Sequence, residues 1–147
     1  MAIQLDVQLA VQDANIPSVS EFKAWAQKIP SPEIDSNVCL RIVGENEVRE
    51  LNKRYRNIDK PTNVLSFGAD IPEELGLNIL GDVVICASVV FQEAVDQEKK
   101  LTSHWAHLLV HGILHLQGFG HENDSQAEIM EALEINILEQ LGMGNPY

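Results

Sequence analysis

The sequence predicts an α+β fold in which a small mixed β-sheet packs against several helices. Four segments of strand length are apolar or alternate in polarity, and five longer segments repeat apolar residues with helical spacing. Turn-forming residues separate these segments. The same order of elements also allows a three-layer α/β arrangement. No internal repeat or flexible linker interrupts it, so we expect a single domain over residues 1–147.

The predicted strands are short and differ in pattern. Residues 3–11 alternate in polarity, which is typical of a half-buried strand, whereas Asn37–Val43 and Leu80–Ala87 are more continuously apolar. Val64–Phe67 follows a cluster of turn residues and is the fourth predicted strand. Gly68–Asn78 contains Pro72 and Gly76 and is predicted to be a loop.

The predicted helices differ in how clearly their ends are marked. We expect helices over Ser18–Ile29, Glu45–Tyr55 and Leu101–Gln117. A further helix is expected to be capped by Ser88 and to reach Lys99. The last helix is expected to open with the capping box Ser125–Glu128 and to be closed by Gly142.

Two of these helices have amphipathic patterns that predict which side chains face the core. In Glu45–Tyr55, the predicted core residues are Val48, Leu51 and Tyr55. In the last helix, the predicted apolar face is Ile129, Leu133, Ile137 and Leu141, and the predicted solvated side is Glu128, Glu131, Glu134 and Glu139.

Composition indicates an ordinary globular protein. Hydrophobic residues make up 45% of the chain, and its first residues lack the basic segment and apolar core of a signal peptide. The apolar run Leu108–Leu116 is too short to cross a bilayer. Cys39 and Cys86 lie in apolar runs without CxxC spacing, which predicts buried free thiols. We therefore expect a cytoplasmic protein without membrane contact.

The formal net charge of −12 disfavours a nucleic-acid partner, but the basic residues are unevenly placed. Six of the ten Lys and Arg residues fall within positions 41–60, and residues 101–147 contain none. Arg49 and Arg54 each follow an acidic residue by four positions and can be ion-paired with it. Lys53, Arg56 and Lys60 have no acidic residue at that spacing. This basic sector is either a solvated helix face or a phosphate-binding surface.

All five histidines lie between His104 and His121, and three of them have metal-ligand spacing. His111 and His115 are four residues apart and share one helix face, Gly118 can end that helix, and His121 then completes the pattern HxxxHxxGxxH. Three nitrogen ligands leave a coordination position open, as in catalytic zinc sites. We interpret the set as a metal site.

The neighbouring positions refine this interpretation. For His104 and His107 we expect a supporting hydrogen bond or a packing contact. In zincin-like metalloproteases of the HExxHxxGxxH type, a glutamate after the first histidine is the general base, and here that position is Gly112. The pattern therefore keeps a zincin-like metal helix but lacks the peptidase base. Gly112 itself indicates either close approach by another group or tight helix packing.

Three blocks of the sequence resemble the YbeY family of endoribonucleases, namely Trp105–His121, Leu51–Phe67 and Leu80–Cys86. Together with the order of elements, the resemblance covers nearly the whole chain. It implies a metal-dependent hydrolase that cuts single-stranded RNA in ribosomal RNA maturation and ribosome quality control. It also implies RNA, the ribosome or ribosomal proteins as partners, with no DNA substrate expected.

The resemblance further implies one zinc ion per chain, held by His111, His115 and His121. The active-site arginine of the family corresponds to Arg56, whose planar fork suits phosphate oxygens. We expect Lys53 and Lys60 to contribute to substrate binding. The chain departs from the family at Gly120, because an Asp usually precedes the last histidine. The identity of the proton acceptor therefore stays open.

Two other functions are compatible with the residues. One is a metallopeptidase-like hydrolase whose base comes from elsewhere, and the other is a non-catalytic, metal-stabilised ribosome-associated factor. The sequence does not distinguish water from the RNA 2′-OH as nucleophile. Three imidazoles favour zinc but also suit nickel or iron.

Overall fold

The computed structural model describes residues 2–31, 35–69 and 78–147 and confirms the α+β fold. Its elements in chain order are β1 (Ile3–Leu9), α1 (Val19–Gln27), β2 (Ser36–Val43), α2 (Glu45–Arg56), β3 (Val64–Gly68), β4 (Ile79–Cys86), α3 (Ala87–Asp96), α4 (Leu101–Leu116) and α5 (Asp124–Gln140). Most of the predicted loop 68–78 lies outside the described residues.

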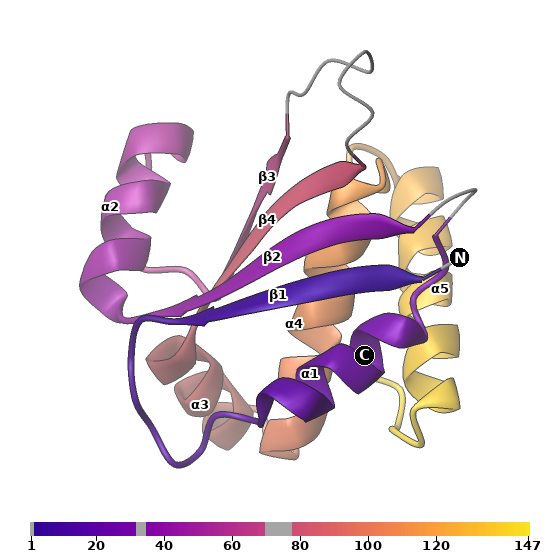
Figure 1. The fold of residues 1–147 in the computed structure, drawn as a ribbon, viewed down its shortest axis with the longest axis horizontal. Coiled ribbons are helices and arrows are strands. Elements are labelled where there is room, and N and C mark those ends of the chain that lie inside the picture. The colour runs from indigo at the N-terminus through magenta and orange to yellow at the C-terminus, as the bar shows by residue number, and fades with distance from the viewer. Residues whose placement is uncertain (1, 32–34, 70–77) are drawn as a thin grey trace.

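The described strands form one mixed sheet in the order β1-β2-β4-β3 (Figure 1). β1 pairs with β2 and β2 with β4 in parallel, and β3 runs antiparallel to β4 at the edge of the sheet. In this register Ser66 lies opposite Val83, and Phe67 opposite Asp82. The histidine helix α4 packs against both the edge strand β3 and its neighbour β4.

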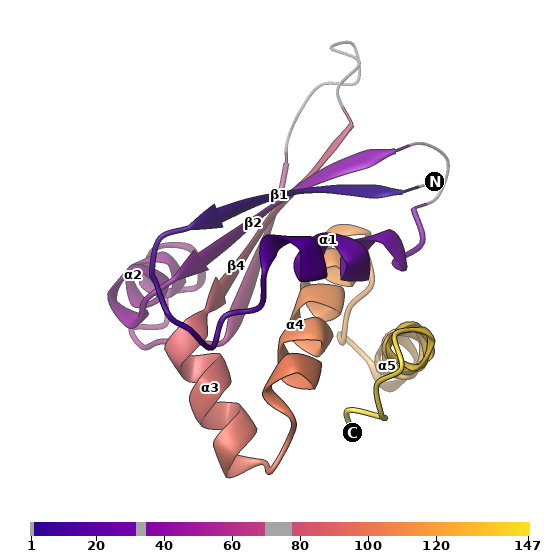
Figure 2. The same ribbon diagram turned by 60° about the horizontal axis from the view of Figure 1, so that its bottom comes forward.

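The main core lies between the sheet and α1, α3, α4 and α5, which gather on one side of it (Figure 2). Leu40 and Ile85 of the sheet, Phe22 of α1 and Trp105 and Leu109 of α4 are all fully or almost fully buried there. Burying a side chain of this size contributes about 1.5–3 kcal/mol. The central position of α4 in this core gives its histidines a rigid support.

The opposite face of the sheet is only partly covered, by α2. A smaller cluster forms there from Val43, Leu65 and Val84 of the strands and Val48 of the helix. Tyr55 was expected to face the core, and that prediction is wrong: its side chain is 60% exposed. Asn52 is buried in its place and donates a hydrogen bond to the carbonyl of Lys60. The Tyr55 ring contacts Phe67 of the edge strand and leaves most of its surface open.

Two predicted helix caps are also wrong. The last helix begins at Asp124, because the side chain of Asn123 accepts the capping hydrogen bond from the Gln126 N–H, two residues before the predicted Ser125 cap. α3 begins directly after β4, and the hydroxyl of Ser88 donates to Glu45 on α2. At the last helix a neighbouring side chain therefore takes the capping hydrogen bond. At α3 no side chain caps the helix, and the Ser88 hydroxyl is bonded to another helix.

Within the described ranges, no helix combines the length and apolar character needed to cross a membrane. Cys39 and Cys86 are both free thiols, with Cys86 buried and Cys39 half-buried.

Candidate functional site

Three histidines converge at one end of α4. His111 and His115 stand one turn apart with ring centroids separated by 4.6 Å. The chain leaves the helix through Gly118, whose φ of +99° belongs to the left-handed region that favours glycine, and returns His121 to a stacked position 5.0 Å from His111. One ring nitrogen from each of the three lies within 4.8 Å of the others. This group could hold a metal ion.

The distance between the first two ligand atoms fits a metal. His111 Nε2 and His115 Nε2 are 3.1 Å apart. Two nitrogens each 2.0–2.1 Å from a tetrahedral ion would be separated by about 3.3 Å. Burial, with added repulsion from His111 and His121, lowers the pKa of His115 and favours the neutral ring that a metal requires. The donor set is therefore suited to a divalent cation such as zinc.

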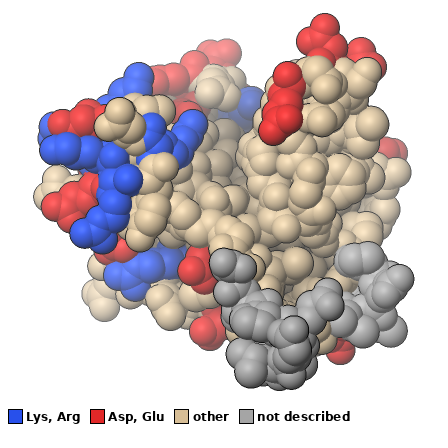
Figure 3. Space-filling view, turned by 90° about the horizontal axis from the view of Figure 1, so that it is seen from above, with Lys and Arg blue, Asp and Glu red and all other residues tan. Residues whose placement is uncertain are grey.

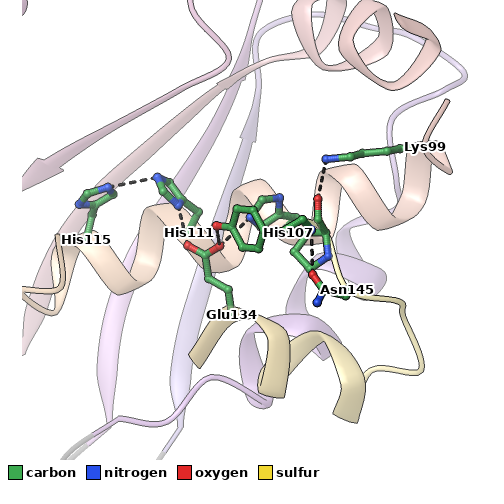
Figure 4. A network of polar contacts seen from close by, with 8 residues as sticks. Lys99, His107, His111, His115, Glu134 and Asn145 are labelled. Carbon is green, nitrogen blue, oxygen red and sulfur yellow. Dashed lines mark hydrogen bonds and ion pairs between the residues drawn. The ribbon is translucent and has the colours of Figure 1, made fainter. Parts of the chain in front are cut away.

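Glu134 of α5 holds His111 in position from behind (Figure 4). Its carboxylate is fully buried and accepts hydrogen bonds from His111 Nδ1 at 2.7 Å and His107 Nε2 at 2.6 Å, and also from the hydroxyl of Tyr147. Because the Nδ1 of His111 donates its proton to Glu134, its Nε2 presents a lone pair towards His115. Carboxylates commonly orient metal-binding histidines in this way.

Glu134 was expected on the solvated side of the last helix, and that prediction is wrong because its side chain is completely buried. A signal was present in the sequence: Met130 precedes Glu134 by four residues, and Ile137 and Leu138 follow it by three and four. These three residues are the apolar face that is in fact buried, whereas the predicted face residue Ile129 is 56% exposed.

The protonation of Glu134 follows from these hydrogen bonds. Burial alone would raise its pKa, but the donors His107, His111 and Tyr147 outweigh burial and lower the pKa to about 2. The phenol of Tyr147 responds in the opposite direction: burial and the hydrogen bond to Glu134 raise its pKa. Glu134 therefore stays ionised at neutral pH and acts as an acceptor for both histidines.

A second group of His107, His111 and Glu134 also brings donor atoms close together, but it fits a metal less well. Its nitrogen–oxygen distances of 2.6 and 2.7 Å are those of charge-assisted hydrogen bonds. Two ligands of one tetrahedral ion would lie farther apart, at about 3.3 Å. We therefore assign this group a structural role behind the first.

The supporting contacts expected of His104 and His107 are confirmed. His107 bonds to Glu134, and the buried His104 bonds through Nε2 to Glu93 at 3.0 Å. Glu93 in turn accepts from the side-chain amide of Asn63 at the start of β3. Burial lowers the pKa of His104, although Glu93 opposes that shift. The network links α3 and α4 to the edge strand.

Gly112 lies where α4 touches the sheet. A Cβ added there would come within 2.7 Å of Val83 Cγ1 and 3.3 Å of Ser66 Oγ, and the Ser66 hydroxyl already donates to the Gly112 carbonyl at 3.0 Å. Tight helix packing is thus the reason for this glycine. The same contact leaves no space for the glutamate that a zincin peptidase carries at this position.

The histidines line a cleft of about 1330 Å³ that is shared with the last turn of α2. Arg56, predicted as the catalytic arginine, also lines this cleft. The basic side chains gather on the side of the molecule that carries α2 (Figure 3). The structure therefore brings Arg56 and the metal-ligand candidates to one cavity.

Lys53 and Lys60 lie elsewhere. Lys53 lines a separate hollow on the outer side of α2 with Arg49 and Arg54, and Lys60 is exposed beyond that helix. Arg49 forms its ion pair with Asp59 at 2.7 Å, not with Glu45 as the sequence suggested. A substrate-binding role for the two lysines stays a prediction.

Comparisons with known proteins point to one family. The sequence model of a family described as endoribonuclease YbeY matches residues 7–142. The endoribonuclease YbeY of Colwellia psychrerythraea is 47% identical over 152 residues, covering 100% of this chain and 98% of that protein. The solution structure of TM1509 from Thermotoga maritima matches 95% of this chain and 92% of its own, with a TM-score of 0.62 and 24% identity. The last likeness supports the fold alone.

Replacing Glu134 tests its role behind His111. We expect Glu134→Gln to weaken zinc binding by about 10- to 100-fold, because the neutral amide orients the imidazole less strongly. Chelator competition measures the dissociation constant, and Glu139→Gln, an exposed position on the same helix, is the control. Equal zinc affinity in wild-type and Glu134→Gln protein would contradict the assignment.

Gly112→Ala tests the packing of α4 on the sheet. The new methyl group would collide with Val83, so we expect a loss of about 1–3 kcal/mol in the free energy of unfolding, although alanine alone favours a helix by about 1 kcal/mol. Denaturant titration measures the change. In a double-mutant cycle, Val83→Ala should make Gly112→Ala less destabilising, because the smaller side chain leaves space for the new methyl group. If the losses in the free energy of unfolding simply add, the contact with Val83 is not their cause.

Proposed function

Because this chain belongs to the YbeY family of endoribonucleases, we propose that it is a zinc-dependent enzyme that cuts single-stranded RNA during ribosomal RNA maturation and ribosome quality control. The observation that carries the proposal is the convergence of three imidazoles on the wall of a cleft that also contains Arg56. We further propose that residues 1–147 act as one domain, in the cytoplasm and in contact with ribosomal components.

In this proposal His111, His115 and His121 hold one zinc ion. When bound, zinc lowers the pKa of water to about 7 and polarises phosphoryl oxygens. The chain's own contribution is to fix the ligands: α4 supplies two from a buried helix, and Glu134 holds the tautomer of His111 by accepting its Nδ1 proton at 2.7 Å. Burial and the neighbouring His111 and His121 lower the pKa of His115, which favours the neutral ring that can bind a metal.

Arg56 is the proposed catalytic residue on the opposite wall. Its guanidinium can donate two parallel hydrogen bonds to the scissile phosphate, and negative charge builds up there as the bond breaks. Arg56 is exposed and lines the cleft, so its guanidinium is accessible to a substrate bound there. Lys53 and Lys60, outside the cleft lining, are proposed to contact flanking phosphates of a longer RNA.

Peptide hydrolysis is disfavoured by the packing of Gly112 against Val83, which excludes the usual peptidase base. A non-catalytic ribosome-associated factor differs from the proposal in one measurable respect: its metal would support stability without any RNA cleavage. The metal experiment below distinguishes the two.

His115→Ala tests the metal site. Purified variant protein should retain much less zinc by elemental analysis and lose metal-dependent cleavage of a single-stranded RNA oligonucleotide, because one of three ligands is gone. Thr102→Ala, an exposed position on the same helix and outside the cleft, is the control and should keep its zinc. Equal zinc content and equal cleavage in wild-type and His115→Ala protein would overturn the proposal.

Arg56→Ala tests the catalytic arginine. We expect kcat to fall by about 100-fold or more, the usual effect of removing a donor to developing charge, with no change in zinc content. Arg54→Ala is the matched control, because Arg54 lies on the same helix but lines the outer hollow. If both variants lost activity to the same small extent, Arg56 would be only one part of a diffuse basic surface.

A further inference from the structure

Tyr55 is a large aromatic side chain placed in the cleft and left exposed. It precedes Arg56 at the end of α2, lines the same cavity as the three histidines, and is 60% exposed. Its ring packs edge-on against Phe67 of β3, with centroids 5.0 Å apart and planes inclined by 61°. Phe67 is itself anchored against the smaller apolar cluster of the sheet. The contact therefore fixes the Tyr55 ring while much of its surface stays open.

Other exposed aromatic side chains among the described residues have different surroundings. Tyr147 donates its hydroxyl to the buried Glu134. Phe91, which is 43% exposed, lies in a separate hollow that contains the acidic residues Glu45 and Glu93. Tyr55 alone among these three combines exposure with a place in the histidine cleft.

The charge of the cleft indicates what its wall must bind. Among the described lining residues, Arg41 and Arg56 are balanced by Glu47 and Asp82, so their formal charges cancel. Arg41 is also engaged directly with Glu47 at 2.6 Å. Phosphate attraction normally dominates nucleic-acid affinity, but these four side chains supply little of it and leave it to the zinc ion proposed at one point of the cleft. Contacts to the bases would therefore add to the affinity for an RNA strand along the rest of the cleft.

We propose that Tyr55, supported by Phe67, is a stacking platform for an unpaired nucleobase of the RNA substrate. This inference deepens the proposed function and rests on it. Bases stack on aromatic rings irrespective of their sequence. A base next to a phosphate held by Arg56 comes within reach of the adjacent Tyr55, so the two neighbouring residues bind adjacent parts of one nucleotide strand.

The platform supplies a physical basis for a preference for single strands. In an A-form duplex each base is already stacked and paired, so its face is not available to Tyr55. An unpaired base can turn outward and stack on the ring. Discrimination then comes from the accessibility of the base face and not from its hydrogen-bonding edge.

The test compares the zinc-loaded 147-residue chain with its Tyr55→Ala, Tyr55→Phe and Phe91→Ala variants. The substrate is a single-stranded RNA oligonucleotide, and KM and kcat are measured separately. We expect Tyr55→Ala to raise KM by about tenfold or more, as loss of a stacking contact does elsewhere, while kcat changes little. Tyr55→Phe, which keeps the ring, and Phe91→Ala, outside the cleft, should stay near the wild-type values.

A fluorescence measurement detects stacking directly. The same oligonucleotide carrying 2-aminopurine at successive positions is titrated with each variant in a His115→Ala background, which prevents cleavage. Quenching at one position should occur with Tyr55 and with Tyr55→Phe and be lost with Tyr55→Ala.

The inference is overturned if Tyr55→Ala leaves both KM and quenching unchanged, or if Tyr55→Phe is as impaired as Tyr55→Ala, because the hydroxyl would then be the active group. Failure of the wild-type chain to cut the RNA would instead contradict the proposed function. In that case the quenching experiment still decides whether the platform exists.

Discussion

One buried carboxylate holds the histidine cluster together. Glu134 is completely inaccessible to water, yet it stays ionised because donors from α4 and from Tyr147 surround it. Removing one partner of such a buried charge typically costs about 3–5 kcal/mol. The interaction therefore does two things at once: it fastens α5 to α4, and it fixes which nitrogen of His111 faces the cleft. The candidate metal site depends on the packing of a helix that contributes none of its ligands.

Two helices line the cleft together with strands of the sheet, and the two helices pack differently on that sheet. α4 is buried in the main core and is packed so closely that Gly112 leaves no space for a methyl group beside Val83. α2 covers only part of the opposite face, so its last turn projects Tyr55 and Arg56 into the cavity. One wall is thus rigid and carries the metal-ligand candidates, while the other presents exposed side chains suited to contact a polymer.

Features of the site that depend on residues close together in the sequence could be predicted, and features that depend on contacts between distant elements could not. The three ligand candidates lie within eleven residues, and helix periodicity plus one glycine is enough to bring His111 and His121 together. The order and kind of the elements were predicted for the same reason. Glu134 was missed because apolar residues occur on more than one side of α5, so periodicity could not select the buried face, and a glutamate is normally solvated. The exposure of Tyr55 depends on how far α2 extends over the sheet, which no local pattern encodes.

We propose that one metal ion binds to His111, His115 and His121, with Glu134 supporting His111 from the opposite side of the ring. Anomalous diffraction at the zinc absorption edge, recorded from crystals of zinc-loaded protein, locates the ion directly. We expect one peak on the cleft side of α4, about 2.0–2.1 Å from one ring nitrogen of each of the three histidines. A peak between His107 and Glu134, or no peak in the cleft, would contradict it.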